Sequence, residues 1–294
     1  MRIDKSGLSA GVAGAGTMGT GIAITIARAG IPVTLFDVSA EALSRARRQA
    51  HEFYDASVAR GKLAPEAAEI AKTALRCEAD LNALSSCDVI VEAVFEHLPT
   101  KHQLLSSLDG ICRSDMLLLT NASTLSIAEI AAGSCRPDRV VGAHYCLPAQ
   151  MMKLVEMSRG LLTSDEAWQR AWDFQLATGQ RPVETRDRPG FVLNHFCIPY
   201  HNDAIRMIDA GVAEPASVDR AMKAAMGFAM GPLELIDLIG LDTQLRASEA
   251  MFSVTNDPRA APPPLLRRMV AAGLLGRKSR RGFYNYGSDA VYGA

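Results

Sequence analysis

Residues 11–23 read GVAGAGTMGTGIA and contain the pattern G-x-G-x-x-G at Gly14, Gly16 and Gly19. The pattern follows a short apolar run and opens a segment of helical character at Thr17. In this context the first glycine allows a tight turn, the second lets backbone approach a pyrophosphate, and the third lets the helix pack against the strand. The helix N-terminus then offers N–H groups to the phosphates. The stretch predicts a dinucleotide-binding unit whose cofactor contacts are Gly14, Gly16, Thr17, Met18 and Gly19.

A second apolar run, residues 33–36, ends at Asp37. A carboxylate at this place accepts hydrogen bonds from both ribose hydroxyls and repels a 2′-phosphate. Val38 and Ser39 follow, and neither offers the cationic side chain that a 2′-phosphate needs. A glycine-rich turn without a ligand is the alternative, but strand, helix, spacing and acid together favour NAD over that reading and over NADP.

The first half of the chain alternates short apolar runs with amphipathic stretches. Further strands are expected at 88–92, 116–119 and 140–143, and strands separated by helices indicate a parallel, doubly wound sheet of the Rossmann type. The polar stretch 39–76 interrupts this alternation. It has turn residues at 61–65 with helical periodicity on both sides, which predicts a helical hairpin insertion.

The pattern changes in the second half. A helix at 164–179 and a short strand at 181–183 precede a turn, after which strand signals almost vanish. The fold expected is therefore α/β with an all-α C-terminal domain: residues 1–186 as the NAD-binding Rossmann domain and residues 187–294 as a helical domain. Helices are predicted in the second of these at 191–209, 215–226, 232–252 and 264–272.

Composition excludes several classes of protein. The 31 Lys and Arg residues balance 32 Asp and Glu residues, so the chain lacks the positive field of a nonspecific nucleic-acid binder. No window approaches the roughly twenty apolar residues of a membrane span. The glycine motif begins too early to leave room for a signal peptide. Six cysteines stand singly without metal-ligand spacing, which indicates reduced thiols, a cytoplasmic location and no metal site.

Three polar groups follow predicted strands, where a Rossmann sheet places its chemistry. They are the segment 120–123, His144 and Glu156. Oxidation of an alcohol needs a base for the hydroxyl proton, and histidine titrates near working pH. A carboxylate on the far ring nitrogen would orient it, so His144 and Glu156 form a candidate pair. A structural histidine and a surface glutamate remain the alternatives at these two positions.

Blocks along nearly the whole chain resemble the short-chain L-3-hydroxyacyl-CoA dehydrogenases, also called 3-hydroxybutyryl-CoA dehydrogenases. Besides the glycine motif, the blocks are VEAVFEHLPTKHQL (91–104), TNASTLSI (120–127), GAHYCLPAQMMKLVEM (142–157), DRPGFVLNHFCIPYHNDAIRMIDAGVA (187–213), MGPLELIDLIGLDT (230–243) and GRKSRRGFYNY (276–286). The last three lie in the helical half, so more than a Rossmann motif is shared.

The resemblance assigns roles to four catalytic candidates. It implies that His144 is the general base and Glu156 its orienting partner. It also implies that Ser123 hydrogen-bonds the reacting substrate oxygen and that Asn194 closes the site from the helical domain. The reaction implied is NAD-dependent interconversion of a 3-hydroxyacyl-CoA, short-chain in type, and its 3-ketoacyl-CoA.

The same resemblance implies contacts with cofactor, substrate and a second subunit. Glu96 and Lys101 would line the cofactor near its nicotinamide ribose, and the helical domain would pair two subunits into a homodimer. The hairpin 39–76 would meet the acyl-CoA, with phosphate contacts among Arg45, Arg47, Arg48, Arg60, Lys62 and Lys72.

One departure from the family pattern leaves the substrate open. The family reads H-F-F-N-P where this chain reads His144-Tyr-Cys146-Leu147-Pro, so Leu147 replaces an amide. A dehydrogenase of a CoA-free or carrier-bound hydroxy acid, of the L-gulonate, carnitine or glyceryl type, is therefore the alternative. The β-hydroxyacid dehydrogenases are excluded because residues 190–195 contain no lysine. A non-catalytic NAD-binding crystallin or redox sensor is the remote alternative. Cys146, next to Leu147, is interpreted as a packing residue.

Overall fold

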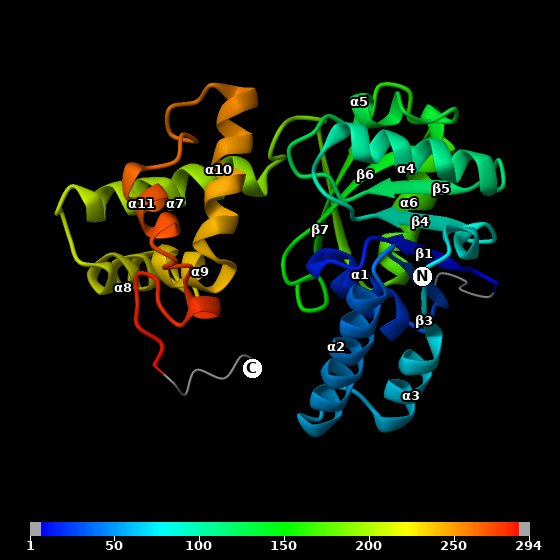
Figure 1. Cartoon of the computed structure of the whole chain (residues 1–294), viewed down its shortest axis with the longest axis horizontal. Helices are drawn as coiled ribbons and strands as arrows, with labels where there is room; N and C mark the ends of the chain where they lie inside the picture. The colour runs from blue at the N-terminus through cyan, green and yellow to red at the C-terminus, as the bar shows by residue number, and fades with distance from the viewer. Residues whose placement is uncertain (1–6, 288–294) are drawn as a thin grey trace. The chain divides into compact units, whose positions relative to one another are not determined.

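An eight-stranded sheet forms the centre of the first unit of the computed structural model, which describes residues 7–287 (Figure 1). Its strand order is β3-β2-β1-β4-β5-β6-β7-β8, and all neighbours run parallel except β6 and β7. This confirms the predicted Rossmann-type sheet. The strands are β1 (Ala10–Ala13), β2 (Val33–Phe36), β3 (Leu75–Glu78), β4 (Val89–Glu92), β5 (Leu117–Thr120), β6 (Val140–Tyr145), β7 (Leu154–Arg159) and β8 (Arg181–Thr185).

Helices cover both faces of this sheet. Helix α1 (Thr17–Arg28) packs Ile22, Ile26 and their neighbours into the main core, while α6 (Asp165–Ala177) contributes Trp168 and Phe174 to it. Helix α4 (Leu98–Ile111) and the short α5 (Ile127–Ala131) connect the later strands. Because strands β1, β4 and β5 are buried on both faces, they are continuous apolar runs rather than alternating ones.

The predicted hairpin is present as α2 (Ala40–Ala59) and α3 (Pro65–Ala74), which extend together beyond the sheet (Figure 1). Ser39 caps α2 by accepting from the Ala42 N–H, and Gly61 supplies the positive φ of +65° in the turn. The insertion is shorter than expected, however, because its last residues enter β3. That edge strand reads Leu-Arg-Cys-Glu with only Leu75 buried, so it lacks the apolar run that reveals other strands.

The second unit is helical and begins at Pro189, two residues beyond the boundary expected from the sequence, with the first unit ending at Arg188. Its helices are α7 (Leu193–Asp209), α8 (Pro215–Met226), α9 (Pro232–Ile239), α10 (Leu241–Thr255) and α11 (Pro264–Ala271). The single helix predicted over 232–252 is wrong. Gly240 adopts φ +104°, outside the helical region, and separates α9 from α10.

The closing segment 276–286 is tied to α9 by one buried carboxylate. Asp237 accepts from the Phe283 and Tyr284 N–H groups at 3.0 and 2.9 Å and from the Tyr286 hydroxyl at 3.0 Å. A second buried carboxylate, Asp219 of α8, accepts from the Tyr284 hydroxyl at 2.6 Å. Within the described range 7–287, no helix is both long and apolar enough to cross a membrane.

Candidate active site

The glycine loop after β1 shows why three positions need glycine. Gly14 has φ +107°, and a Cβ there would lie 2.6 Å from the Ala93 carbonyl oxygen. A Cβ on Gly19 would lie 1.7 Å from the Gly14 carbonyl oxygen, so α1 reaches the strand only without one. Gly16 differs, since a Cβ would have no protein atom within 4 Å. The loop therefore leaves an open space at the N-terminus of α1, where the helix presents its N–H groups.

Asp37 lies beside this loop because β2 pairs in parallel with β1, Ala13 opposite Phe36. Its Oδ2 accepts from the Ala15 N–H at 2.7 Å, and its Oδ1 accepts from the Ser39 N–H at 2.9 Å. These two bonds fix the carboxylate at the carboxyl end of β2. The open space at Gly16 and this anchored acid together fit the pyrophosphate and adenosine ribose of NAD.

His144 and Glu156 meet across the antiparallel pair. Their Cα positions are directly opposed in the β6–β7 ladder, and His144 Nδ1 lies 2.9 Å from Glu156 Oε2. The expectation that Glu156 follows a strand is therefore wrong: it sits inside β7 and reaches the histidine by strand register. A carboxylate only accepts, so Nδ1 carries the ring proton and Nε2 is the basic nitrogen of the neutral ring. Both side chains are buried, which strengthens their interaction.

Ser123 lies on the loop after β5, held by Glu96 from the loop after β4. Glu96 Oε1 accepts from the N–H groups of Ser123, Thr124 and Leu125 at 2.7, 2.8 and 3.3 Å. The Ser123 hydroxyl lies 3.4 Å from the same oxygen. Burial would raise the pKa of Glu96, but the charge of Lys101 and the three N–H groups lower it below the usual value. Glu96 thus anchors the serine loop as a carboxylate.

Lys101 is almost fully buried at 1% exposure, which the sequence did not suggest. Its Nζ lies 2.7 and 2.8 Å from the two oxygens of Glu92 and 3.3 Å from Glu96 Oε2. Glu92 was missed by sequence reasoning. The only available signal was an acid ending the apolar run 89–92, a position that equally suits a surface residue. Asn121 lies in the polar segment 120–123 expected from the sequence, and its side-chain oxygen accepts from the Tyr145 N–H at 2.9 Å, which joins the ends of β5 and β6.

The other candidate residues lie on a helix of the second unit and on a loop and a helix of the first unit. Asn194 is in the first turn of α7 in the second unit, where its N–H donates to the Gly190 carbonyl at 3.0 Å. Leu147, on the loop after β6, exposes 40% of its surface, whereas Cys146 beside it is buried. Lys72 is paired with Asp55 and Glu69 at 2.7 and 2.8 Å, which engages one of the six basic residues considered for phosphate binding.

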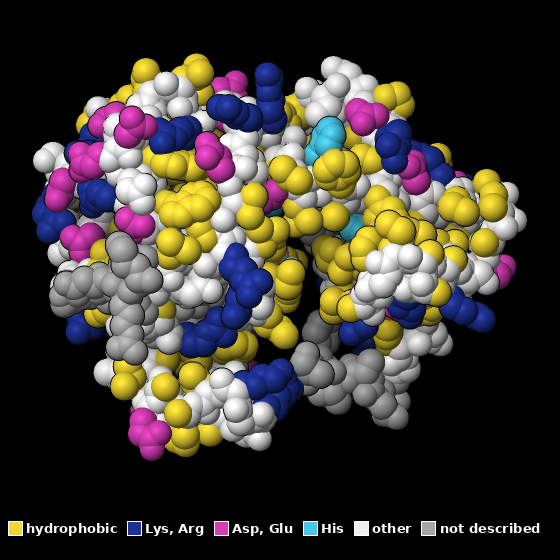
Figure 2. All heavy atoms as spheres, turned by 180° about the vertical axis from the view of Figure 1, so that it is seen from behind, with side chains coloured by type: hydrophobic (Ala, Val, Ile, Leu, Met, Phe, Trp, Pro, Cys, Tyr) yellow, Lys and Arg dark blue, Asp and Glu magenta, His cyan; other side chains and the backbone are white. Residues whose placement is uncertain are grey.

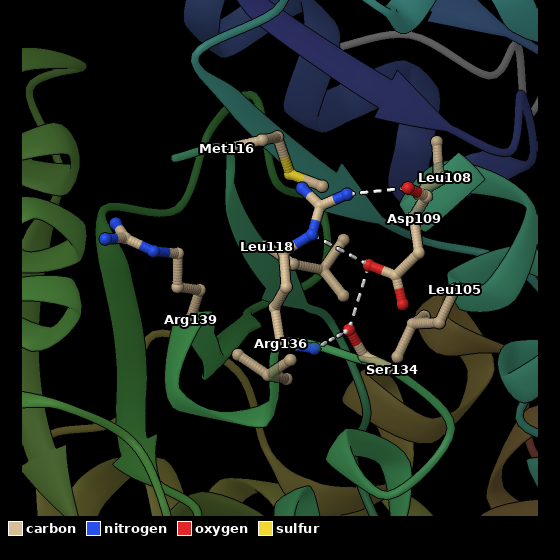
Figure 3. A pocket seen from close by; sticks show the side chains of 9 residues that line it. Leu105, Leu108, Asp109, Met116, Leu118, Ser134, Arg136 and Arg139 are labelled. Carbon is tan, nitrogen blue, oxygen red and sulfur yellow. Dashed lines mark hydrogen bonds and ion pairs between the residues drawn. The ribbon is translucent and has the colours of Figure 1, made fainter. Parts of the chain in front are cut away.

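A small cavity at the opposite end of the sheet is unsuited to a cofactor. It holds about 10 Å³ at the amino ends of β5 and β6, no more than one water needs. Figure 3 shows Arg136 reaching Asp109 of α4 there, with an Nε–Oδ1 distance of 3.3 Å, while Arg139 points away. This ion pair binds the end of α4 to the loop before β6 and has a structural role.

Comparison with known proteins agrees with this geometry. Residues 9–188 match the NAD-binding domain of 3-hydroxyacyl-CoA dehydrogenase, and residues 190–286 match its C-terminal domain. A probable 3-hydroxybutyryl-CoA dehydrogenase of Bacillus subtilis is 40% identical over 275 residues, covering 94% of this chain and 96% of the relative.

Solved structures give the same result. The crystal structure of FadB2 from M. tuberculosis is 40% identical with a TM-score of 0.91, over 95% of this chain and 99% of that one. The (S)-3-hydroxybutyryl-CoA dehydrogenase PaaH1 from Ralstonia eutropha is 35% identical with a TM-score of 0.87, over 95% and 99% of the two chains. The chain therefore belongs to the 3-hydroxyacyl-CoA dehydrogenase family and is an NAD-dependent oxidoreductase.

Proposed function

We propose that this chain interconverts a 3-hydroxyacyl-CoA with a short acyl chain, such as 3-hydroxybutyryl-CoA, and the corresponding 3-ketoacyl-CoA. The His144–Glu156 pair is the observation that carries this proposal, since a buried, oriented histidine supplies the base that alcohol oxidation requires. The names of the relatives, among them 3-hydroxybutyryl-CoA dehydrogenases, support the substrate class.

In the oxidative direction, His144 Nε2 takes the hydroxyl proton while the substrate carbon loses its hydride. Glu156 stabilises the imidazolium through Nδ1, and the Ser123 hydroxyl holds the reacting oxygen. The family resemblance implies that Asn194 has a role in the same reaction. NAD, when bound, would supply the hydride acceptor. Its binding residues in this proposal would be Gly14, Gly16, Thr17, Met18, Gly19 and Asp37, and Glu96 and Lys101 would line it near the nicotinamide ribose.

Replacement of the base tests the mechanism. We expect His144→Gln to lower kcat about 10²- to 10⁴-fold, the usual contribution of a general base, while the Kd for NADH stays within about three-fold. Both are measured on the full chain, kcat with acetoacetyl-CoA and Kd by NADH fluorescence. Near-normal turnover in this variant would remove His144 as the base.

Leu147 favours a second candidate, a dehydrogenase of a hydroxy acid without CoA. Its side chain is apolar and 40% exposed where the family pattern has an amide, so one polar substrate contact is replaced. A panel of short, medium and long 3-hydroxyacyl-CoAs, with carnitine and L-gulonate beside them, separates the two. Turnover of the free acids without turnover of the thioesters would select this second candidate.

A groove beside the hairpin supports CoA as part of the substrate. It encloses about 420 Å³ between the start of α2 and the end of β3, lined by Arg47, Arg48, Ser44 and apolar neighbours. Two guanidinium groups there suit phosphate oxygens. We expect Arg47→Ala/Arg48→Ala to raise KM for acetoacetyl-CoA about ten-fold or more with kcat nearly unchanged. An equal KM for the double variant and the native chain would show that the CoA phosphates do not bind at Arg47 and Arg48.

The setting of the reaction is also proposed. Degradation or synthesis of fatty acids would use this chemistry, and a cytoplasmic site suits the six cysteines, which form no disulfide bond in the described part of the chain. A homodimer formed through the helical unit is supported by the apolar side chains that this unit exposes, among them Phe196, Val212, Met226 and Phe228.

A further inference from the structure

Beneath the serine loop lies a buried ion cluster whose central acid, Glu92, has no task in the proposed chemistry. Glu92, at the carboxyl end of β4, is fully buried at 0% exposure. Its carboxylate accepts from the Val94 N–H at 2.8 Å, from the Thr120 hydroxyl at 2.6 Å and from the Lys101 ammonium at 2.7 and 2.8 Å. A buried carboxylate with this many donors is a fixed point of the fold, and it lies next to the loop that bears Ser123.

Two chains of contacts lead from Glu92 to this loop. In the first, Lys101 also faces Glu96 Oε2 at 3.3 Å, and the other oxygen of Glu96 accepts the N–H groups of residues 123–125. In the second, Thr120 is the last residue of β5, from which the loop departs, and its hydroxyl also accepts from the Ala122 N–H at 3.3 Å. Glu92 is therefore connected to the loop twice, through Lys101 and Glu96 to residues 123–125 and through Thr120 to the residue where the loop begins.

The distances show how the ammonium is shared. The Lys101 ammonium lies closer to both oxygens of Glu92 than to Glu96, so Glu92 is its stronger ion-pair partner. Glu96 can then turn Oε1 toward the loop rather than toward the lysine. Charges interact strongly in such a dry site. If Glu92 lost its charge, Lys101 would move toward Glu96 and draw that carboxylate away from the Ser123 N–H.

We propose that Glu92 is a positioning residue of the dehydrogenase reaction, which sets the place of the Ser123 hydroxyl through Lys101, Glu96 and Thr120. The inference rests on the proposed role of Ser123. It separates this buried acid from an ordinary packing residue, because it predicts that the effect of Glu92 on turnover depends on the serine.

A double-mutant cycle measures that dependence. We expect Glu92→Gln to lower kcat about ten- to a hundred-fold, as a misplacement of about 1 Å does, with KM for acetoacetyl-CoA nearly unchanged. In the Ser123→Ala background the same substitution should cost less than about three-fold, because the group it positions is gone. Equal costs in the two backgrounds, or an unchanged kcat in the single variant, would overturn the proposal.

Two further variants provide a second test and a control for this result. Thr120→Val keeps every charge and removes the hydroxyl contacts with Glu92 and with the Ala122 N–H, so it gives a second cycle with Ser123→Ala if Glu92→Gln does not fold. Asp109→Asn is the matched control: it breaks an ion pair of the same helix, α4, at the end away from the serine (Figure 3). Its cost in kcat should be small and the same with and without Ser123.

The outcomes separate the two levels of the proposal. If Ser123→Ala alone leaves kcat unchanged, the role of Ser123 fails and the positioning of its hydroxyl fails with it. If Ser123→Ala lowers kcat but both cycles are additive, the role of Ser123 stands and only the inference about Glu92 is overturned. Coupling in either cycle, absent from the Asp109→Asn control, supports it.

Discussion

Glu156 gains its place from strand register rather than from its neighbours in sequence. Twelve residues separate it from His144, yet the antiparallel ladder sets the two opposite each other, with their side chains on one face. A slip of one residue would turn Glu156 to the other face of the sheet and leave His144 without it. The buried carboxylate and the proton on Nδ1 thus depend on how the chain turns back over residues 146–153 between β6 and β7.

That turn is anchored on the nucleotide-binding helix. The Ala149 carbonyl accepts from the Thr25 hydroxyl at 3.0 Å, and the Gln150 carbonyl accepts from Arg28 at 3.1 Å, so α1 holds the loop between the two strands. One helix therefore both begins at the glycine loop and helps fix the register of the His144–Glu156 pair.

Glu156→Gln isolates the charge at this position. An amide has nearly the same shape, but its NH₂ group can donate to Nδ1, which would place the ring proton on Nε2 and leave no base facing the substrate. We expect kcat to fall about 10²- to 10⁴-fold while NADH affinity and folding stay close to native values. Steady-state kinetics with acetoacetyl-CoA and a thermal melt check this. A loss of activity matched by a loss of folded protein would instead indicate a structural role.

At the scale of elements, the start of α1 separates two demands on glycine. Glycine is needed at position 19 for packing, since a Cβ on Gly19 would overlap the Gly14 carbonyl, whereas Gly16 faces open space. The same small residue thus serves helix–strand contact at one position and ligand approach at the other.

Alanine at these two positions should give opposite results. Gly19→Ala should lower the free energy of unfolding by about 3 kcal/mol or more through overpacking. Gly16→Ala should fold almost normally and raise the Kd for NADH about ten-fold or more, because its methyl group occupies the space for the pyrophosphate. Denaturant unfolding and NADH fluorescence measure the pair. Equal Kd values for Gly16→Ala and the native chain would contradict the placement of the phosphates.

Helices α7 and α10 are joined by a buried polar network. His201 Nδ1 lies 3.1 Å from Gln244 Oε1, and Gln244 donates to Asn202 and Ser248 at 3.1 and 3.3 Å. Asn202 in turn donates to the carbonyl groups of residues 259–261. Burial lowers the pKa of His201, and its bond to Gln244 opposes this only in part.

This shift predicts a pH dependence of stability. The unfolded chain binds a proton at His201 below about pH 6.5 and the folded chain does not, so the free energy of unfolding falls as pH drops through that value. Between pH 7 and pH 5.5 the loss from this group is about 1.3 kcal/mol at most. His201→Gln should remove that part of the slope in urea titrations. His195→Gln, an exposed histidine of the same helix, is the control, and equal slopes for both variants would contradict the assignment.

The whole molecule consists of a cofactor unit and a helical unit, and both expose large apolar side chains. The helical unit exposes a series of large apolar side chains, and Figure 2 shows hydrophobic atoms spread over its visible face. Such exposure is common at subunit interfaces. The balanced charge of the chain, a formal net charge of -1, offers little repulsion against self-association.

A homodimer is therefore expected in solution. Sedimentation velocity at micromolar concentrations should give about twice the mass of one chain. Met226→Glu/Phe228→Glu, which places charges on two exposed apolar positions of the helical unit, should weaken association at least about ten-fold. Leu161→Glu/Leu162→Glu makes the same change on the exposed turn after β7 of the cofactor unit and should leave the mass unchanged. A native chain that sediments as a monomer would refute the dimer.

The sequence by itself determined the local features of this protein. The glycine loop, Asp37, most strands and helices, and the residue types of the catalytic pair depend on neighbours a few positions away, so periodicity and motif spacing reveal them. The sequence did not predict edge strand β3, because that strand lacks an apolar run. It did not predict the helix break at Gly240 either, because the break depends on a backbone angle. Only the tertiary structure decided that Glu156 faces His144, and that Glu92 and Lys101 are buried behind Ser123. Those contacts come from strand order and register, which bring distant residues together and remove their charges from water.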